Sequence, residues 1–331
     1  MSAATRPLLE VKHLRVEFPT RRGTLVAVDD VSFSIAPGEV LGVVGESGAG
    51  KSMTGAAIIG LIESPGRIGA GEIWLEGKRI DNLPPEAMRR IRGRRIGAIF
   101  QDPLTSLNPL YSVGRQLVET IQTHLDLSGS AARRRAVELL QSTGIQAAEQ
   151  RIDHFPHQFS GGMRQRVVIA LALAAEPKLI IADEPTTALD VSIQAQIIAL
   201  LKKLCRDHGT AVMLVTHDMG VIAETADRVA VMYAGRIVEI GPVADVIHRA
   251  QHPYTVGLMG SIPSLITETE RLAQIDGAMP RLNAIPSGCA FNPRCPCVFD
   301  RCRVDRPILA PTGATEAACW LHGALAVEDL R

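Results

Sequence analysis

The sequence predicts an α/β fold with a parallel sheet at its core, an antiparallel β subdomain, a helical subdomain and a small cysteine-rich C-terminal extension. Continuous apolar runs of strand length stand at Val40–Val44, Leu179–Ala182 and Ala211–Val215, as is typical of strands buried on both faces. Helices are expected beside the later runs, at about 163–175 and 191–208. A glycine-rich turn after the first run completes a strand–loop–helix unit.

Composition bounds the classes of protein that the chain can represent. It has 331 residues, with 35 Lys and Arg against 35 Asp and Glu, which excludes a strongly basic nucleic-acid binder and an acidic disordered chain. The longest apolar stretch, Val167–Ala175, is far shorter than the roughly 20 residues that span a bilayer. The first residues lack the apolar region of a secretory signal. We therefore expect a cytosolic type of protein whose membrane role, if any, is peripheral.

The first strands alternate between apolar and polar side chains. This pattern predicts strands at Leu9–Phe18 and Val28–Ile35, with a polar connection at Pro19–Gly23. A hairpin is expected over Gly71–Ile80, turning at Glu76-Gly77. These segments form the predicted antiparallel subdomain.

The remaining elements divide the chain into two expected domains. The pattern is helical and charged from about 105 to 165, and a closing hairpin is expected at Arg228–Tyr233 and Arg236–Ile240. Beyond Pro253 the composition shifts to Pro, Gly, Arg and Cys. We place the boundary at about 260, so that residues 1–260 form the main domain and 261–331 the extension.

The glycine-rich turn carries the first functional motif. It matches the P-loop pattern G-x-x-x-x-G-K-[ST] between a buried strand and a helix. Backbone N–H groups of such a loop surround phosphate oxygens, its lysine neutralises phosphate charge and its hydroxyl binds Mg²⁺. The motif residues are Gly45, Glu46, Ser47, Gly48, Ala49, Gly50, Lys51 and Ser52.

Two acidic residues end the strand at Leu179–Ala182. A carboxylate there is costly unless it meets a cation, so Asp183 fits an Mg²⁺ ligand and Glu184 a general base that polarises water. The alternative is a pair of surface acids that cap the strand.

A second anion-binding helix start lies at Phe159–Gln165. Ser160 can cap the helix, and Gly161 and Gly162 allow the backbone to approach an anion. Because the chain already has its own P-loop, this second helix start predicts a phosphate supplied by another subunit.

In these residues the sequence resembles the ATP-binding subunits of ABC transporters. Six motifs of that family occur in its order, although the signature begins with Phe159 where leucine is familiar. They are the Walker A loop Gly45–Ser52, the Q-loop residue Gln101, the signature Ser160–Gln165, the Walker B strand Leu179–Asp183, the D-loop Ala188-Leu189-Asp190 and the H-loop residue His217.

The resemblance implies the remaining roles. Catalysis would involve Glu184, His217 at the γ-phosphate and Gln101 at the water or metal, and Mg²⁺ would be held by Ser52, Gln101 and Asp183. Ser160, Gly161, Gly162 and Gln165 would contact the ATP of a partner subunit. Phe18 is the candidate for stacking on adenine, although a strand Phe can equally belong to the core.

The tail is similar to that of the peptide-importer branch, which serves oligopeptides, dipeptides and nickel. His252-Pro253-Tyr254-Thr255 and the cysteines of the extension carry this similarity. It implies two permease subunits, a second ATPase subunit (identical or homologous), an extracytoplasmic peptide-binding protein and no nucleic acid, at the cytoplasmic face of a bacterial inner membrane. Alternatives are nickel, glutathione or another small solute as cargo, or a soluble ABC ATPase outside transport.

Some members of this branch hold a [4Fe–4S] cluster, which here would use Cys289, Cys295, Cys302 and Cys319. Zinc accepts the same four thiolates, and a tail that only packs is a further alternative. A reducing compartment disfavours disulfides. Cys297 has no counterpart in the family pattern, and Cys205 is expected to be a packing residue.

Overall fold

The computed structural model describes residues 6–186, 190–261 and 274–322. These residues form two compact units, each of which is described by itself. Unit 1 takes the described residues of 1–9, 35–40 and 75–215, and unit 2 takes those of 10–34, 41–74 and 216–331. No helix in these described ranges is both long enough and apolar enough to span a membrane.

Unit 1 contains three parallel strands, β6 (Ile96–Ile99), β7 (Leu179–Asp183) and β8 (Ala211–Val215). β7 lies between the other two, with Leu179 opposite Ile96 on one side and Ala211 on the other. All of β8 and the first four residues of β7 are buried. The apolar runs therefore form the interior strands that the sequence predicts, and Asp183 stands at the carboxyl end of β7.

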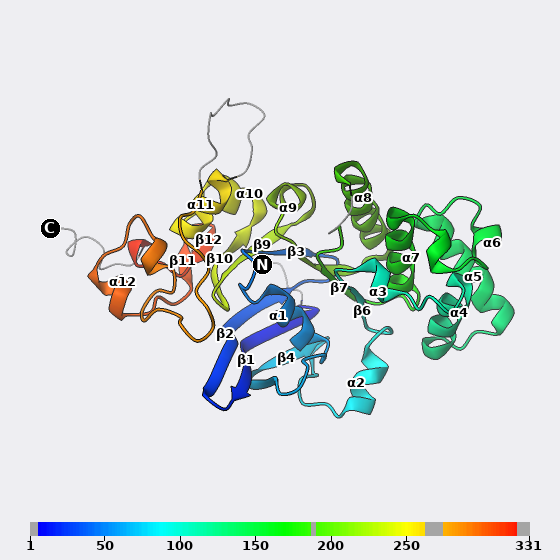
Figure 1. Ribbon diagram of the computed structural model, residues 1–331, viewed down its shortest axis with the longest axis horizontal. Helices are drawn as coiled ribbons and strands as arrows, with labels where there is room; N and C mark the ends of the chain where they lie inside the picture. Colours follow the sequence, from blue (N-terminus) through cyan, green and yellow to red (C-terminus); the bar gives the residue numbers. More distant parts are fainter. Residues whose placement is uncertain (1–5, 187–189, 262–273, 323–331) are drawn as a thin grey trace. The chain divides into compact units, whose positions relative to one another are not determined.

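The helices of unit 1 follow from the predicted helical stretch. α4, α5 and α7 pack on one another (Figure 1), with Leu117, Ile121, Ala136, Leu140 and Val167 buried. The other segments are shorter or flank the strands. The elements are β5 (Lys78–Arg79), α2 (Pro85–Ile91), α3 (Pro103–Ser106), α4 (Val113–His124), α5 (Gly129–Ser142), α6 (Ala148–Arg151), the 3-10 turn η1 (Pro156–Gln158), α7 (Gly161–Leu173) and α8 (Val191–His208).

Unit 2 contains the long strands β1 (Leu9–Thr20) and β2 (Gly23–Ile35), with β4 (Arg67–Leu75) beside β1. Only residues 21–22 separate β1 from β2, so the predicted connection at Pro19–Gly23 was too long. The Thr20 hydroxyl donates to the Gly23 carbonyl at 2.7 Å, which extends the hairpin to its tip. Strands joined by so short a turn run antiparallel.

The second sheet of unit 2 runs in the order β3 (Val40–Val44), β9 (Arg228–Tyr233), β10 (Arg236–Pro242), β12 (Thr315–Ala317) and β11 (Ala310–Thr312). β3 is parallel to β9, whereas the later pairs are antiparallel. The helical segments of this unit are α1 (Lys51–Ile58), α9 (Met219–Thr225), α10 (Val243–His248), α11 (Pro253–Gly260), η2 (Asn292–Arg294), α12 (Asp300–Val304) and η3 (Trp320–His322).

The C-terminal extension shares the interior of unit 2. β12 adds to the edge of β10, with Ala317 opposite Glu239. Phe291 is 2% exposed and packs edge-on against Tyr233 and Tyr254, at ring-centroid distances of 5.2 and 5.4 Å. The extension therefore gains its stability from a shared aromatic cluster and sheet edge.

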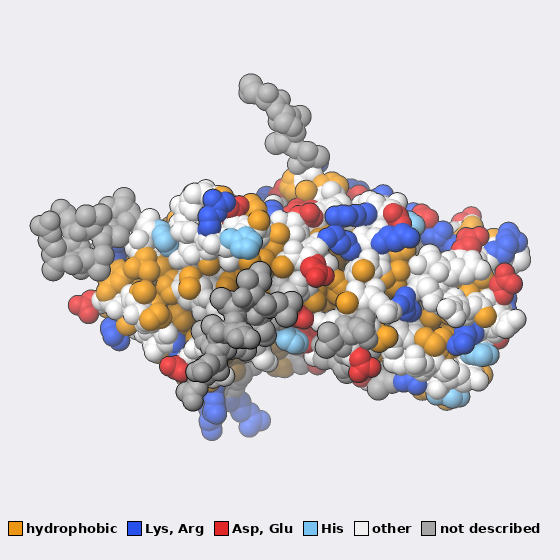
Figure 2. Space-filling view, turned by 90° about the horizontal axis from the view of Figure 1, so that it is seen from above, with side chains coloured by type: hydrophobic (Ala, Val, Ile, Leu, Met, Phe, Trp, Pro, Cys, Tyr) orange, Lys and Arg blue, Asp and Glu red, His pale blue; other side chains and the backbone are white. Residues whose placement is uncertain are grey.

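The surface is mixed in charge. On the face that Figure 2 presents, Lys and Arg side chains are interspersed with Asp and Glu. This distribution agrees with the equal numbers of basic and acidic residues in the sequence.

Candidate functional site

The phosphate loop joins β3 to α1 in unit 2. Gly45 and Gly50 have φ angles of +148° and +101°, which residues other than glycine rarely adopt. Lys51 is only 6% exposed, and its Nζ donates to the carbonyl oxygens of Gly45 at 2.8 Å and Glu46 at 3.1 Å. The loop thus curls around the ammonium group of its own lysine, and α1 begins at that residue. Such a loop can surround a phosphate with backbone donors.

The acidic pair stands at the end of β7 in unit 1. The Glu184 backbone has a φ of +45°, and its N–H donates to the Val215 carbonyl at 2.8 Å. Gln101 follows β6 in the chain, and its Nε2 donates to Glu184 Oε2 at 3.0 Å. The structure therefore brings together two of the residues that the sequence placed in catalytic roles.

The signature segment begins α7. Ser160 is the N-cap, and its hydroxyl accepts from the Met163 N–H at 3.4 Å. A Cβ on Gly162 would lie 2.8 Å from Ile193 of α8, so a glycine is required for this close helix packing. Phe159 is 3% exposed, which explains why an aromatic residue is tolerated in that position.

Gln165 lies inside unit 1. It is 1% exposed, and neither polar atom of its side chain has a hydrogen-bond partner among the described residues. A ligand can therefore reach Ser160 and Gly161, which are exposed at the start of α7, whereas the side chain of Gln165 is buried.

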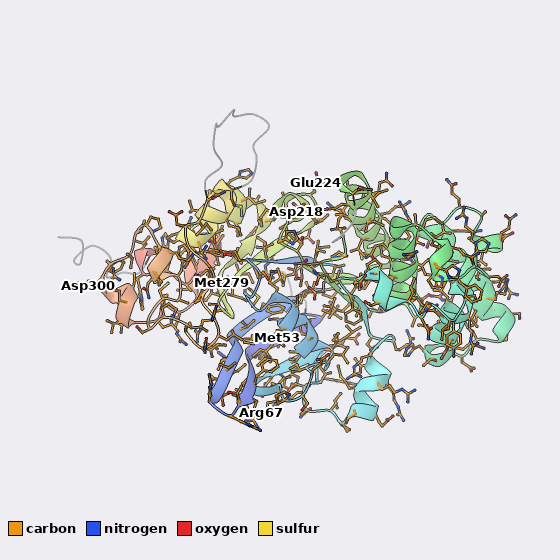
Figure 3. All side chains as sticks on the ribbon, in the orientation of Figure 1. Met53, Arg67, Asp218, Glu224, Met279 and Asp300 are labelled. Carbon is orange, nitrogen blue, oxygen red and sulfur yellow. The ribbon has the colours of Figure 1, made fainter. Side chains whose placement is uncertain are left out.

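His217 is exposed and directly precedes Asp218, the N-cap of α9. Asp218, labelled in Figure 3, caps this helix by accepting from the N–H groups of Gly220 at 2.8 Å and Val221 at 3.2 Å. Because the cap fixes the first turn of α9, it also fixes the backbone from which His217 projects.

The remaining predicted site residues are Phe18 and those of the D-loop. Phe18 is half-buried in β1, and its ring packs so closely on Gly66 that a Cβ there would overlap it. Of the D-loop, Ala188 and Leu189 lie outside the described residues, and Asp190 is the exposed N-cap of α8.

The cysteines of the extension converge in unit 2. One small pocket is lined by Cys289, Cys295, Cys297, Cys302 and Cys319, together with His252, Phe291 and Trp320. Among the described residues, no group of three or more His, Cys, Asp or Glu is close enough to hold a single metal ion. Cys205 is buried in α8, as expected of a packing residue.

Two thiols in this pocket, those of Cys295 and Cys319, lie in surroundings that disfavour the thiolate form. The pKa of Cys295 is raised to about 11 and that of Cys319 to about 12, chiefly by burial and to a smaller extent by the neighbouring cysteines. Backbone hydrogen bonds from Cys297 and Leu321, respectively, act in the opposite direction. Without a bound cation, these thiols are therefore protonated at neutral pH.

The fold and these motifs define an ATP-binding cassette. The family model described as "ABC transporter" matches residues 28–187, and the model described as "Oligopeptide/dipeptide transporter, C-terminal region" matches residues 238–302. The chain belongs to the family of ATP-binding subunits of ABC transporters and carries the C-terminal region of the oligopeptide/dipeptide members. It is therefore an ATPase whose hydrolysis of ATP is coupled to transport.

Individual relatives are similar in sequence to this protein over nearly the whole chain. The chain is 46% identical to the oligopeptide transport ATP-binding protein AppD of Bacillus subtilis, over 95% of this chain and 97% of that protein. It is 47% identical to the dipeptide transport ATP-binding protein DppD of Escherichia coli, over 91% and 92%. A dimeric structure of the ATP-binding cassette MJ0796 with ADP and Pi has 30% identity and a TM-score of 0.64, over 71% of this chain and 98% of that one.

Sequence reasoning missed two residues that contact the phosphate loop. Tyr254 and Arg294 both hydrogen-bond Glu46. Tyr254 was noted as part of the branch pattern, but no periodicity or spacing signals that it reaches a loop more than 200 positions earlier in the chain.

Proposed function

We propose that the protein hydrolyses ATP to energise the import of dipeptides and oligopeptides through a membrane ABC transporter. The observation that carries the hydrolytic part is the hydrogen bond of Gln101 to Glu184 at the carboxyl end of β7. The peptide cargo is supported by the oligopeptide/dipeptide C-terminal region and by the relatives named for oligopeptide and dipeptide transport. Nickel, glutathione and other small solutes are the alternative cargoes.

The proposed roles in hydrolysis follow from the chemistry of each side chain. Glu184 is the general base toward water, and Gln101 orients that carboxylate and the water. Lys51 and the backbone of residues 45–52 bind the phosphates, while Ser52, Gln101 and Asp183 hold Mg²⁺, which neutralises phosphate charge when bound. His217 donates to the γ-phosphate, and Phe18 stacks on the adenine.

A second cassette completes the proposed assembly. Ser160 and Gly161 are exposed at the start of α7, where a helix N-terminus favours an anion. They would contact the ATP of the partner, with Gly162, Gln165 and the D-loop residues Ala188, Leu189 and Asp190 beside them. The dimeric structure of the similar cassette MJ0796 supports this arrangement. ATP-dependent closure would then drive the conformational change of the transporter.

The proposed permease contact lies in unit 1 near the Q-loop. Phe100 directly precedes Gln101 and is 47% exposed, and Leu110 is 79% exposed. We place the subunit at the cytoplasmic face of a bacterial inner membrane, with two permease subunits and an extracytoplasmic peptide-binding protein.

Transport assays in a strain that lacks the gene test the function and the cargo together. Uptake of a labelled dipeptide, a longer peptide and nickel is measured after complementation with the wild type or with Lys51→Ala. We expect peptide uptake to return only with the wild type. Restoration of nickel uptake alone would replace the cargo, and unchanged peptide uptake without the gene would contradict the peptide assignment.

We also propose that the cysteine pocket holds a [4Fe–4S] cluster through Cys289, Cys295, Cys302 and Cys319. Each thiolate of such a cluster binds a different iron, so the cysteines need not surround one point as the ligands of a single zinc ion do. Backbone N–H groups directed at thiols, such as that of Phe291 toward Cys289, also suit iron–sulfur ligation. A cluster there would tie together a loop that has few large apolar residues.

Anaerobic purification tests the cluster. We expect the wild type to carry iron and acid-labile sulfide in equal amounts and to absorb in the visible range, and we expect Cys302→Ser to lose both. Cys205→Ser is the matched control, because Cys205 belongs to unit 1 and does not line the pocket. Zinc in place of iron, or a metal-free protein with normal stability, would contradict the assignment.

A further inference from the structure

Glu46, the second residue of the phosphate loop, forms hydrogen bonds through its N–H, its carbonyl and its carboxylate. Its N–H donates to the Tyr254 hydroxyl at 2.9 Å. Its carbonyl accepts from Lys51 Nζ at 3.1 Å. Its carboxylate accepts from Arg294 Nη1, at 3.0 Å for one oxygen and 3.2 Å for the other. Two of these three contacts come from the C-terminal part of unit 2.

Arg294 is built into the extension as a rigid donor. Its side chain is 7% exposed, and its Nε donates to the Asp276 carbonyl at 2.8 Å while Nη2 donates to the Ile275 carbonyl at 3.2 Å. The guanidinium carbon lies 5.8 Å from the centre of the Tyr233 ring. A guanidinium fixed by several acceptors holds a carboxylate in one place.

The same segment also lies against the loop itself. A Cβ on Gly48 would be 3.9 Å from Met279, which Figure 3 labels together with Met53 of α1. Tyr254 is fully buried, and its ring meets that of Tyr233 at 4.7 Å. The contacts on Glu46 therefore rest on well-packed side chains.

The charge of Glu46 explains why its pairing with Arg294 affects ATP binding. A carboxylate in a loop that receives a polyphosphate repels the ligand. Pairing with Arg294 compensates that charge and fixes its position, whereas removal of the arginine would leave the carboxylate partly buried and unpaired.

We infer that Arg294 and Tyr254 are positioning residues for ATP: by holding Glu46, they set the affinity of the phosphate loop for the nucleotide. This inference rests on the proposed ATP-binding role of the loop. It gives the C-terminal extension a part in the ATPase reaction, in addition to any role of its cysteines.

The test compares Arg294→Met, Glu46→Gln and the double variant in the purified protein. Arg294→Met keeps the aliphatic stem and removes the charge. We expect it to raise the Kd and the KM for ATP about tenfold, because a carboxylate is left without its partner, with kcat at saturating ATP nearly unchanged. The double variant should return to within about threefold of the wild type, since the unpaired carboxylate is gone. A purely structural role of Arg294 would not be rescued by Glu46→Gln.

A second test variant and a control variant complete the experiment. Tyr254→Phe removes only the hydroxyl that accepts from the Glu46 N–H, so we expect a smaller rise of the Kd even if Arg294→Met does not fold. Arg306→Met is the matched control, because Arg306 pairs with Asp29 rather than with the loop. Wild-type affinity in both Arg294→Met and Tyr254→Phe, or no rescue in the double variant, would overturn the inference. Lys51→Ala separates the two proposals, because normal ATP binding in that variant would refute the role of the loop itself.

Discussion

At the scale of single residues, Glu184 combines two constraints. Its backbone φ of +45° is unusual for a residue other than glycine, and such conformations persist only where the surroundings hold them. Here the backbone is fixed by the Val215 carbonyl and the carboxylate by Gln101. The side chain is therefore held in a defined orientation, as a base that polarises water requires.

Glu184→Gln tests this role directly. We expect ATP to bind normally while phosphate release falls about 10²- to 10⁴-fold, the range that general-base catalysis contributes. Glu176→Gln is the control, because Glu176 is an exposed partner of Arg135 in the same unit. Turnover of Glu184→Gln equal to that of the wild type would remove the residue from the catalytic role.

At the scale of elements, the phosphate loop depends on backbone shape. Gly45 has a positive φ, and a Cβ in that position would overlap the Met232 carbonyl of β9. We expect Gly45→Ala to lower the free energy of unfolding by about 1–3 kcal/mol, measured by denaturant titration. Gly129→Ala is the control, since a Cβ at Gly129 meets nothing within 4 Å. Equal stability of the two variants would contradict this view of the loop.

The start of α9 depends on its cap. Asp218→Ala removes the acceptor of two backbone N–H groups, and the loss of such a cap costs about 1 kcal/mol. Because His217 precedes the cap, we expect ATP hydrolysis to fall as well. Asp218→Asn keeps an acceptor oxygen and should retain most of the stability and activity in thermal-unfolding and phosphate-release assays. A loss in the asparagine variant as large as in the alanine variant would rule out capping as the cause.

At the scale of the whole molecule, a charge cluster within unit 2 joins four segments of the chain. Asp29 of β2 pairs with Arg15 of β1, Arg236 of β10 and Arg306 of the extension. Burial alone would raise the pKa of Asp29, but the hydrogen bond and charge of Arg236, with the charges of Arg306 and Arg15, lower it overall.

The lowered pKa predicts how this cluster responds to acid. Its contribution to stability is fully present above the ordinary pKa of 3.8 and is lost as pH falls through the lower folded pKa. We therefore expect the wild type to lose more stability than Asp29→Asn when the pH is lowered below about 4, as measured by urea unfolding over a pH series. Parallel curves for the two proteins would show that Asp29 is not differentially ionised in the folded state.

The sequence by itself determined the local elements and the order of the motifs. Continuous apolar runs allow few alternatives to interior strands, as β3, β7 and β8 show, and a Gly-rich loop with Lys51 carries its chemistry in neighbouring residues. The β1–β2 turn is shorter than predicted, because the strands continue to Thr20 and Gly23, where the Thr20 hydroxyl forms hydrogen bonds across the turn.

Only the tertiary structure decided which distant residues meet. Gln101 and Glu184 are 83 positions apart, and Glu46 and Arg294 are 248 apart, so no periodicity links them. The placement of β12 beside β10 and the convergence of the cysteines likewise arise from packing in three dimensions. The physical reason is that side-chain pairing across long separations depends on how the strands and the aromatic cluster pack, whereas periodicity records only the faces of single elements.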